Sequence, residues 1–433
     1  MRYLPQTQKS RDEMLEAVGA KSIDDLYVDV PAQAFIDGKA DLPDHKGEME
    51  VERIMHSYAN QNHAASAGPF FLGAGAYFHH IPASVDYIIQ RSEFLTAYTP
   101  YQPEIAQGTL QMIFEFQTFV AQITGMEIAN ASLYDGATSA TEAALMAMRI
   151  TKRRKIAIGN AIHPDYEAVL RAYMSNFDDI EVVDGDPADD TACVIIQSPD
   201  FYGQPHKYEA LRKQCDDTGA LLIVVVTEIL SLGLLPAPVE ADIVCGEAQS
   251  IGVALSYGGP HLGFFACKEK FVRQMPGRLC GITEDADGKR GFVLTLNTRE
   301  QHIRRDKATS NICTNQGLCA LAFTVHMSLL GEDGFKQLAR INHEAACKTA
   351  DALNAIDGVT LVSETFFNEF TITLSKPAND IVEALAAKGI IAGYAPKSSK
   401  GGQGDENKLI VCATEITQDS DIEALAEGLK EAL

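Results

Sequence analysis

Between residues 155 and 267 the chain alternates short apolar, β-branched runs with amphipathic segments. The apolar runs predict strands at 155–158, 180–183, 192–197, 221–226, 242–245 and 262–267, and the amphipathic segments predict helices at 164–175 and 208–216. The run at 221–226 is apolar at every position, which is typical of a strand buried on both faces of a parallel sheet. This alternation predicts an α/β domain with a large parallel or mixed sheet and helices on both faces.

The segments on either side of this alternation predict two further regions. Before it, helices are expected at 11–20, where Ser10 is the predicted N-cap and Gly19 lies near the end, and at 47–60, 110–124 and 142–149. After it come apolar helices at 318–330 and 335–353, strands at 370–374 and 409–412, helices at 381–388 and 422–433, and an exposed flexible loop at 397–408. We therefore expect an N-terminal helical extension (1–70), a large α/β domain (71–330) and a small C-terminal α+β domain (331–433).

The charge balance restricts the partners of the chain. Its 433 residues include 59 acidic and 36 basic side chains, a net charge of −23, which disfavours nucleic acids and anionic membranes. No apolar run is long enough to span a bilayer, and the N-terminus lacks the apolar core of a secretory signal. The nine cysteines are scattered without a CxxC pair, so we expect buried reduced thiols in a cytoplasmic protein.

Several catalytic motifs are missing from the sequence. It contains no Walker A motif, no GxGxxG that opens a helix after a strand, no HExxH and no GxSxG. The adjacent pair His79 and His80 would point to opposite faces of an extended strand, so we expect a structural role and no metal site.

The order of elements is that of the fold-type I pyridoxal phosphate enzymes, and three local features support this analogy. The small residues of 135–147 open a helix whose N-terminus suits a phosphate, although a plain helix start explains them equally well. His163 follows the strand at 155–158, where this fold often stacks an aromatic ring on the cofactor. Glu228 follows the strand at 221–226, where the fold places an aspartate on the pyridine nitrogen.

The lysine that such an enzyme needs for its Schiff base is missing. The expected position holds Gln249, whose amide cannot form an imine. Lys207 lies too early in the order of elements, and Lys268 and Lys270 lie beyond the next strand. The chain therefore has a pyridoxal-phosphate fold without its covalent anchor, which favours a partner that supplies the lysine.

Long motifs that span nearly the whole chain now identify a family. They are FLGAGAYFHHIP (71–82), YTPYQPEIAQG (98–108), FQTFVAQITGMEIANASLYDGAT (116–138), SLGLL (231–235), MPGRL (275–279) and TREQHIRRDKATSNICTNQ (298–316). The sequence closely resembles the α-type chains of the glycine decarboxylase (P-protein) family of the glycine cleavage system. It departs from the family pattern near 226, where Glu228 replaces Asp and Ile229 replaces Pro.

The resemblance implies a division of labour between two homologous subunits. The β subunit carries the Schiff-base lysine and binds pyridoxal phosphate, and the α subunit is a degenerate copy that is active only in the complex. The assembly, expected to be an α2β2 heterotetramer, decarboxylates glycine and passes the aminomethyl group to the lipoyl arm of the H-protein. In this chain the resemblance leaves no cofactor-binding residue, only the degenerate positions Gln249, His163 and Glu228.

Two groups of residues are candidates for a role in the complex. Tyr98, Tyr101 and Glu104 lie in a stiff, polar-aromatic segment and are expected to project into a site shared with the β subunit; packing at the interface is the alternative. Arg299, His302, Arg304 and Arg305 form a basic patch that fits an acidic partner or a structural ion-pair cluster equally well. The sequence also leaves open a non-catalytic scaffold that only stabilises the β subunit or docks the H-protein.

Overall fold

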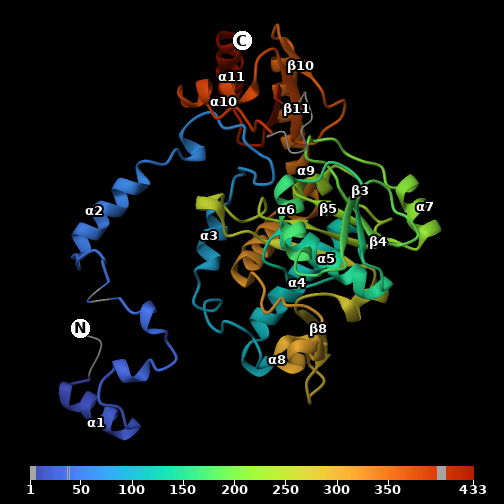
Figure 1. Cartoon of the computed structure of the whole chain (residues 1–433). Coiled ribbons are helices and arrows are strands. Elements are labelled where there is room, and N and C mark those ends of the chain that lie inside the picture. The colour runs from blue at the N-terminus through green and yellow to red at the C-terminus, as the bar shows by residue number, and fades with distance from the viewer. Residues whose placement is uncertain (1–5, 37, 39, 397–405) are drawn as a thin grey trace. The chain divides into compact units, whose positions relative to one another are not determined.

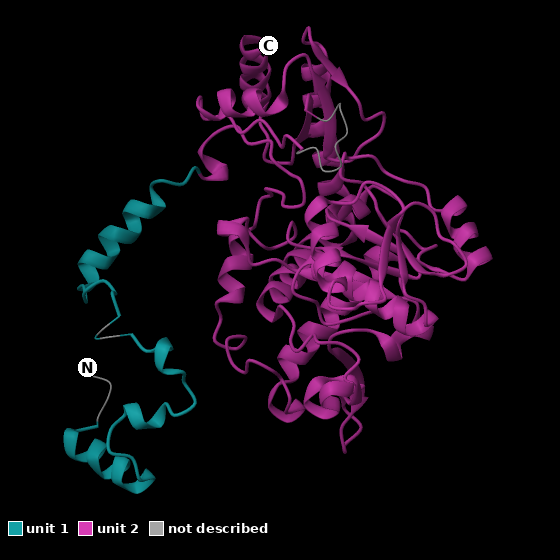
Figure 2. Cartoon of the chain, viewed as in Figure 1, with its two compact units in different colours: residues 1–63 teal, residues 64–433 magenta. Residues whose placement is uncertain are grey.

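Figure 1 shows the computed structural model of the chain, which describes residues 6–36, 38, 40–396 and 406–433. Contacts divide the chain into two units, Met1–His63 and Ala64–Leu433 (Figure 2). The first unit contains helices α1 (Gln8–Val18) and α2 (Glu48–Ala59). The domain borders expected at 70 and 330 remain predictions. None of the described helices is long and apolar enough to cross a membrane.

The large sheet of the second unit is mixed. Its strands run in the order β1-β7-β6-β5-β4-β2-β3. Their bounds are β1 (Ile128–Ala129), β2 (Lys155–Ile158), β3 (Glu181–Asp184), β4 (Thr191–Gln197), β5 (Leu221–Val226), β6 (Ile243–Glu247) and β7 (Gly263–Cys267). Strands β3, β2, β4, β5 and β6 are parallel, whereas β7 is antiparallel to both β6 and β1. The predicted α/β fold with a parallel or mixed sheet is confirmed.

Side chains of β5 alternate between two apolar cores, one on each face of the sheet. Leu222, Val224 and Val226 lie in the core that is covered by α4 (Gln107–Thr124), α7 (Glu209–Thr218) and the first half of α9 (Gly317–Asn354). The alternate side chains of β5 lie in the other core, beneath α5 (Gly136–Thr151) and α6 (Pro164–Met174). Because neither face reaches solvent, every position of this strand is apolar.

The C-terminal part of the unit forms a smaller antiparallel sheet with its own core. Its strands, in the order β10-β11-β12, are β10 (Val359–Leu361), β11 (Glu369–Leu374) and β12 (Lys408–Cys412). Helices α10 (Ala378–Ala386) and α11 (Asp419–Ala432) pack on it. Phe71, far away in sequence, is completely buried in this core. The segment at the start of the large domain is therefore anchored in the small one.

Two features of local structure differ from the predictions. The N-cap of α1 is Thr7, not Ser10, because the Thr7 hydroxyl accepts the Ser10 amide at 3.2 Å, while Gly19 ends the helix as expected. The two helices expected at 318–330 and 335–353 are confirmed as the two parts of α9, which meet at a kink at Gly331 (φ 61°), where a left-handed backbone favours glycine. The ribbon of β8 (Leu279–Glu284) and β9 (Arg290–Thr295) was missed.

Other predictions of local structure fall into two groups. The helix expected at 142–149 is confirmed but begins earlier, because the small residues of its opening form the first turn of α5. The flexible loop expected at 397–408 lies mostly outside the described residues, and its described end enters β12 at Lys408. The nine cysteines are free thiols, eight of them buried or half-buried and Cys313 exposed.

Gly246 provides a test of the close approach between β5 and β6. Its φ is 156°, and a Cβ at this position would lie 1.8 Å from the Val226 carbonyl oxygen. We expect Gly246→Ala to lower the free energy of unfolding by at least about 2 kcal/mol, since the backbone of a buried strand must shift. Urea unfolding followed by circular dichroism measures this, because the chain has no tryptophan. Gly108→Ala is the matched control, since its Cβ meets no atom within 4 Å; equal midpoints for the two variants would contradict the prediction.

Candidate functional site

The three degenerate positions lie together at the carboxyl edge of the large sheet. His163 is the N-cap of α6 after β2, Glu228 follows β5, and Gln249 follows β6. In an open α/β sheet this edge is where ligands bind. Glu228 and Gln249 are buried and His163 is half-buried. All three are in contact with one stretch of the same chain, residues 73–80, which we call the filling segment.

Two of these contacts use the backbone of the filling segment. The Nε2–H of His163 donates to the Ala74 carbonyl oxygen at 2.7 Å, while its Nδ1 accepts the Asp165 amide at 3.1 Å. Burial lowers the pKa of His163, which keeps the ring neutral. The Tyr77 amide donates to Oε1 of Gln249 at 3.3 Å. The imidazole and the amide that would face a cofactor ring are thus bonded to protein backbone.

The third contact is a buried ion-pair cluster around His79. Its Nε2–H donates to Glu228 at 3.0 Å and its Nδ1–H donates to Glu415 at 2.8 Å. Burial alone would lower the pKa of His79, but the charges and hydrogen bonds of both carboxylates outweigh it and raise the pKa to about 10. Ser250 and Asn342 donate further hydrogen bonds to the two carboxylates, at 2.6 and 2.9 Å. The carboxylate expected to face a pyridine nitrogen is therefore neutralised by the chain itself.

Tyr77 joins the filling segment to the small domain. Its hydroxyl donates to Glu369 of β11 at 3.2 Å, and Glu369 also accepts the Ala74 amide at 2.5 Å. Burial raises the pKa of Glu369 to about 7. At pH 7 this carboxyl group is about half protonated, which reduces the negative charge buried beside Tyr77.

The N-terminus of α5, where the sequence suggested a phosphate, is occupied by carboxylates. Asp135 caps the helix and accepts the Thr138 amide and hydroxyl, each at 2.8 Å. Glu247 of β6 accepts the Gly136 amide at 3.0 Å, and burial raises its pKa. Tyr166 closes the remaining space, because a Cβ on Gly136 would lie 2.0 Å from its hydroxyl. Amides that would bind an anion already bind two acidic side chains.

Pyridoxal phosphate therefore does not fit these residues. Its phosphate would meet Asp135 and Glu247, its ring would meet the filling segment, and its aldehyde would meet an amide. Lys268 does not substitute for the missing lysine, because its Nζ donates to Asp242 at 3.0 Å, at the opposite end of β6.

The predicted residues Tyr98, Tyr101 and Glu104 lie elsewhere, on the exposed stretch that precedes α4. Tyr98 is 86% exposed and borders a surface cavity of about 600 Å³. Residues 314–317, at the start of α9, form the other wall of this cavity. Segments about 200 positions apart are thus brought together at one surface, which we call the 94–101/314–317 surface.

Arg278 fixes both walls of this surface. The buried guanidinium donates to the Cys313 carbonyl at 2.9 Å and to the side chains of Thr314 and Asn315, each at 3.2 Å. It also lies 5.7 Å from the centre of the Tyr101 ring, which packs against His302 as well. A planar cation with several fixed donors holds the two segments rigidly.

The basic patch is partly structural. Arg299 is buried and donates to the carbonyl oxygens of Met275, Gly277 and Leu296. Arg304 donates to the Thr298 carbonyl at 3.2 Å. These bonds favour the structural interpretation for both arginines.

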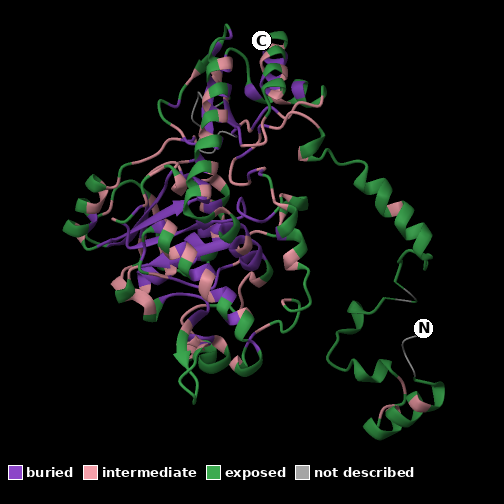
Figure 3. Ribbon diagram, turned by 180° about the vertical axis from the view of Figure 1, so that it is seen from behind, coloured by how far each residue is buried: buried purple, intermediate pink, exposed green. Residues whose placement is uncertain are grey.

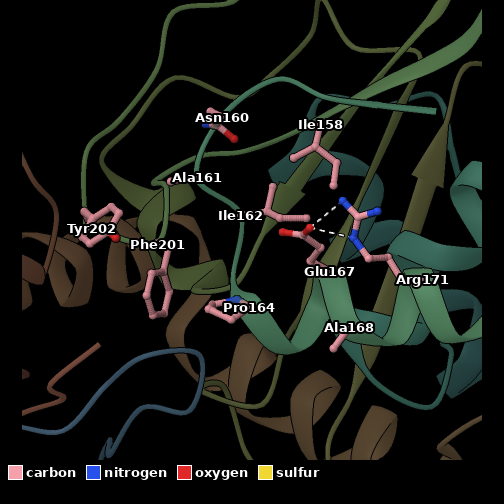
Figure 4. A pocket seen from close by; sticks show the side chains of 10 residues that line it. All are labelled: Ile158, Asn160, Ala161, Ile162, Pro164, Glu167, Ala168, Arg171, Phe201 and Tyr202. Carbon is pink, nitrogen blue, oxygen red and sulfur yellow. Dashed lines mark hydrogen bonds and ion pairs between the residues drawn. The ribbon is translucent and has the colours of Figure 1, made fainter. Parts of the chain in front are cut away.

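Another pocket, of about 350 Å³, lies between the end of β2 and α6 (Figure 4). Glu167 and Arg171 form an ion pair at 2.7 Å along one wall. Asn160, which also lines the pocket, exchanges hydrogen bonds with the backbone of Gln197. The chain itself engages these polar groups, so we assign the pocket no chemical role.

The space between Gln249, His163 and Glu228, where a cofactor would lie, is called the cofactor-type cavity below. The residues that fill it were not identified from the sequence. The spacing of Asp135 and Thr138 is that of a helix N-cap and the residue bonded to it, so this interaction could have been predicted from the sequence. For Tyr77, Glu369 and Glu415 no local signal exists, because their partners lie about 150 to 340 positions away.

The cluster around His79 generates a stability prediction. The substitution His79→Gln removes the buried imidazolium and leaves the carboxylates of Glu228 and Glu415 without a positive charge between them. It is therefore expected to lower the free energy of unfolding by about 3–5 kcal/mol at pH 6. Because folding raises the pKa of His79 from 6.5 to about 10, its contribution is complete below pH 6.5 and is lost as the pH rises towards 10. The stability of His79→Gln should lack this decrease between pH 6.5 and 10.

His80→Gln is the matched control for this experiment. His80 is exposed, and it reaches Glu415 through its backbone amide, at 2.6 Å, which the substitution retains. Urea unfolding between pH 6 and 10 compares the three proteins. If His79→Gln and His80→Gln unfold alike at every pH, the ion-pair cluster does not stabilise the fold.

Comparison with known proteins agrees with this geometry. The family described as "Glycine cleavage system P-protein" matches residues 1–429. The chain is 56% identical to "Probable glycine dehydrogenase (decarboxylating) subunit 1" of Parvibaculum lavamentivorans, over 100% of each chain. It is 57% identical to the protein of the same name from Caulobacter vibrioides, over 99% of each.

Solved structures give the same result. A crystal structure of glycine decarboxylase (P-protein) of the glycine cleavage system, in inhibitor-bound form, superposes with a TM-score of 0.89 at 40% identity over 100% of each chain. A sphingosine-1-phosphate lyase from Burkholderia pseudomallei, at 15% identity and a TM-score of 0.64 over 91% of this chain and 92% of its own, shows the shared fold alone. On sequence and structure together, the chain belongs to the P-protein family of the glycine cleavage system.

Proposed function

We propose that this chain is the non-cofactor-binding subunit of a two-chain glycine decarboxylase. The relatives named "subunit 1" match it from end to end, and that name implies a second subunit. The observation that carries the proposal is the cofactor-type cavity, which the filling segment occupies and in which Gln249 stands at the expected lysine position. A chain with this fold and this filled cavity needs a partner for the chemistry.

In this proposal the second subunit binds pyridoxal phosphate through its lysine, and the cofactor supplies the electron sink for loss of the glycine carboxyl group. The aminomethyl group then passes to the lipoyl arm of the H-protein. The assembly is an α2β2 heterotetramer in the cytoplasm. Full-length similarity to decarboxylating glycine dehydrogenase chains supports the reaction, and the acidic composition agrees with protein partners rather than nucleic acid.

The contribution of this chain is assigned to the 94–101/314–317 surface together with Glu104. Tyr98, Tyr101 and Glu104 are exposed in the single chain, so their polar tips are accessible to a partner. Arg278 fixes both segments of this surface from behind. Groups that are held in fixed positions can orient a substrate or a carrier arm. Their hydrogen bonds can also stabilise the charge that develops in the transition state.

A scaffold that only stabilises the second subunit is the competing function. It predicts that the same surface is packing alone, and that its hydroxyl and carboxylate groups are dispensable. The filled cavity agrees with both functions, so the surface residues decide between them.

Near-isosteric variants separate the two functions. We expect Tyr98→Phe or Glu104→Gln to lower turnover of the reconstituted decarboxylase by at least about tenfold, because a hydrogen bond to developing charge is lost. Co-elution with the second subunit and its pyridoxal phosphate content should remain normal. Turnover is measured as CO2 released from labelled glycine with lipoylated H-protein.

Tyr173→Phe serves as the control for these variants. Tyr173 is an exposed tyrosine on α6 that does not line the cavity of this surface, and its variant should match the parent. If Tyr98→Phe and Glu104→Gln also assemble and turn over like the parent, these residues are interface packing and the chain is a scaffold.

A further inference from the structure

A cationic pocket lies where α5 ends and β2 begins. Buried residues concentrate in the strands of the large sheet, and the helices around them carry exposed residues on their outer sides (Figure 3). The pocket lies at this outer level and has a volume of about 440 Å³, within the range of small-molecule sites. Three basic and three apolar side chains line it; they are Arg149, Lys152, Arg154, Leu145, Met148 and Phe177.

This pocket is separate from the sites described above. Helix α5 begins at the carboxyl edge of the large sheet, where the Gly136 amide donates to Glu247. Its 16 residues span about 24 Å, so Lys152, which follows its last residue, lies near the opposite edge. The six lining residues are not among those of the cofactor-type cavity or of the 94–101/314–317 surface.

Arg149 is a half-buried cation whose charge is compensated only in part. Its Nη2 donates to the Gln274 carbonyl oxygen at 3.1 Å, whereas its buried Nε has no hydrogen-bond partner among the described residues. The nearby carboxylate of Glu142 accepts the Ser310 hydroxyl at 2.9 Å and attracts the guanidinium without a hydrogen bond. Burial outweighs this attraction and lowers the pKa of Arg149. An added anion would therefore be stabilised here.

The two other basic side chains are exposed and available to a ligand. Within the part of the chain that the structure describes, the Lys152 ammonium group has no ion-pair or hydrogen-bond partner. Arg154 pairs with Asp179 at 3.3 Å, but both side chains are more than half exposed. Such a surface pair contributes little to stability and exchanges easily with another anion.

The surrounding negative charge does not cancel this positive cluster. The C-terminus of α5 contributes about half a negative charge, which a single cation offsets. The whole chain carries a net charge of −23, but at physiological salt the charges that lie more than about 8 Å away are largely screened. The three basic side chains therefore decide which charge the pocket accepts.

The remaining lining and the number of cations define the class of ligand. Met148 is buried, and the Phe177 ring is 43% exposed, so it offers an accessible apolar face. A phosphate group has three strong acceptor oxygens and up to two negative charges, which match three basic side chains better than one carboxylate does. A ligand that combines a phosphate with an apolar part uses both halves of the pocket.

We propose that this pocket binds a small organic phosphate, with the phosphate group on the three basic side chains and the apolar part against Phe177 and its apolar neighbours. The inference concerns this chain alone and does not depend on its proposed function. Inorganic phosphate shares the anionic chemistry, so the experiment includes it as a separate ligand.

Isothermal titration calorimetry of the full-length chain at 0.15 M salt tests the proposal, with phenyl phosphate as the probe. We expect saturable binding at one site. The double variant Lys152→Asn with Arg154→Gln should raise the dissociation constant at least about tenfold, because two charge-assisted hydrogen bonds are lost. Asparagine tolerates the left-handed backbone at position 152 (φ 60°), so the end of α5 is retained. Circular dichroism checks that each variant is folded.

Two further variants complete the experiment. Lys213→Gln with Lys430→Gln removes the same charge from exposed positions outside the pocket, and it should bind phenyl phosphate within about twofold of the parent. Phe177→Ala should weaken phenyl phosphate at least about threefold and leave the affinity for inorganic phosphate unchanged, because only the apolar contact is lost.

Three results would overturn the proposal. The first is the absence of saturable phenyl phosphate binding below about 10 mM. The second is equal binding by the pocket variant and the charge-matched control, which would place the anion elsewhere. The third is an affinity for inorganic phosphate, or for uncharged phenol, that equals the affinity for phenyl phosphate, since either result removes one half of the ligand from the site.

Discussion

The charge on His79 is the interaction on which the rest of the site depends. A buried imidazolium between Glu228 and Glu415 links three parts of the second unit: the filling segment, the carboxyl end of β5, and the small C-terminal domain. Each carboxylate alone would be costly to bury, and the cation between them makes the arrangement stable. The pKa of Glu415 illustrates this, since burial would raise it but His79, the His80 amide and Asn342 lower it to about 2.

The same interaction supports the proposal that this chain acts as a subunit and not as an enzyme by itself. With His79 bound to Glu228, the filling segment is held so that Ala74 meets His163 and Tyr77 meets Gln249. The positions that would hold a cofactor are used for internal packing. Asp135 and Glu247 complete the exclusion at the end where a phosphate would bind, because their carboxyl groups already accept hydrogen bonds from the amides of α5. The 94–101/314–317 surface stays accessible in the second unit.

Much of the fold was predictable from the sequence because its signals are local. The strand at 155–158 has the expected bounds, and the all-apolar run at 221–226 is the central strand β5. The antiparallel direction of β7 was not predictable, because a fully buried strand has the same apolar pattern in either direction. The β8–β9 ribbon was missed because half of β8 is exposed and its burial does not alternate along the strand.

The site was predictable only in part. The absence of lysine at Gln249 and the identities of His163 and Glu228 could be read directly, because they follow recognisable strands. The residues that fill the space between these positions could not be predicted from the sequence. The partners of His79 and Tyr77 lie about 150 to 340 positions away along the chain, and only folding brings them into contact. The roles of Tyr98 and Glu104 depend on a second chain and stay predictions.

The central claim is that this chain does not carry the pyridoxal phosphate of its complex. Borohydride reduction of the assembled enzyme fixes the cofactor to its lysine, and mass spectrometry of the separated chains then locates it. The account predicts a pyridoxyl-lysine in the second subunit and none in this chain, either alone with excess cofactor or in the complex. A stoichiometric pyridoxyl group on one lysine of this chain would contradict it.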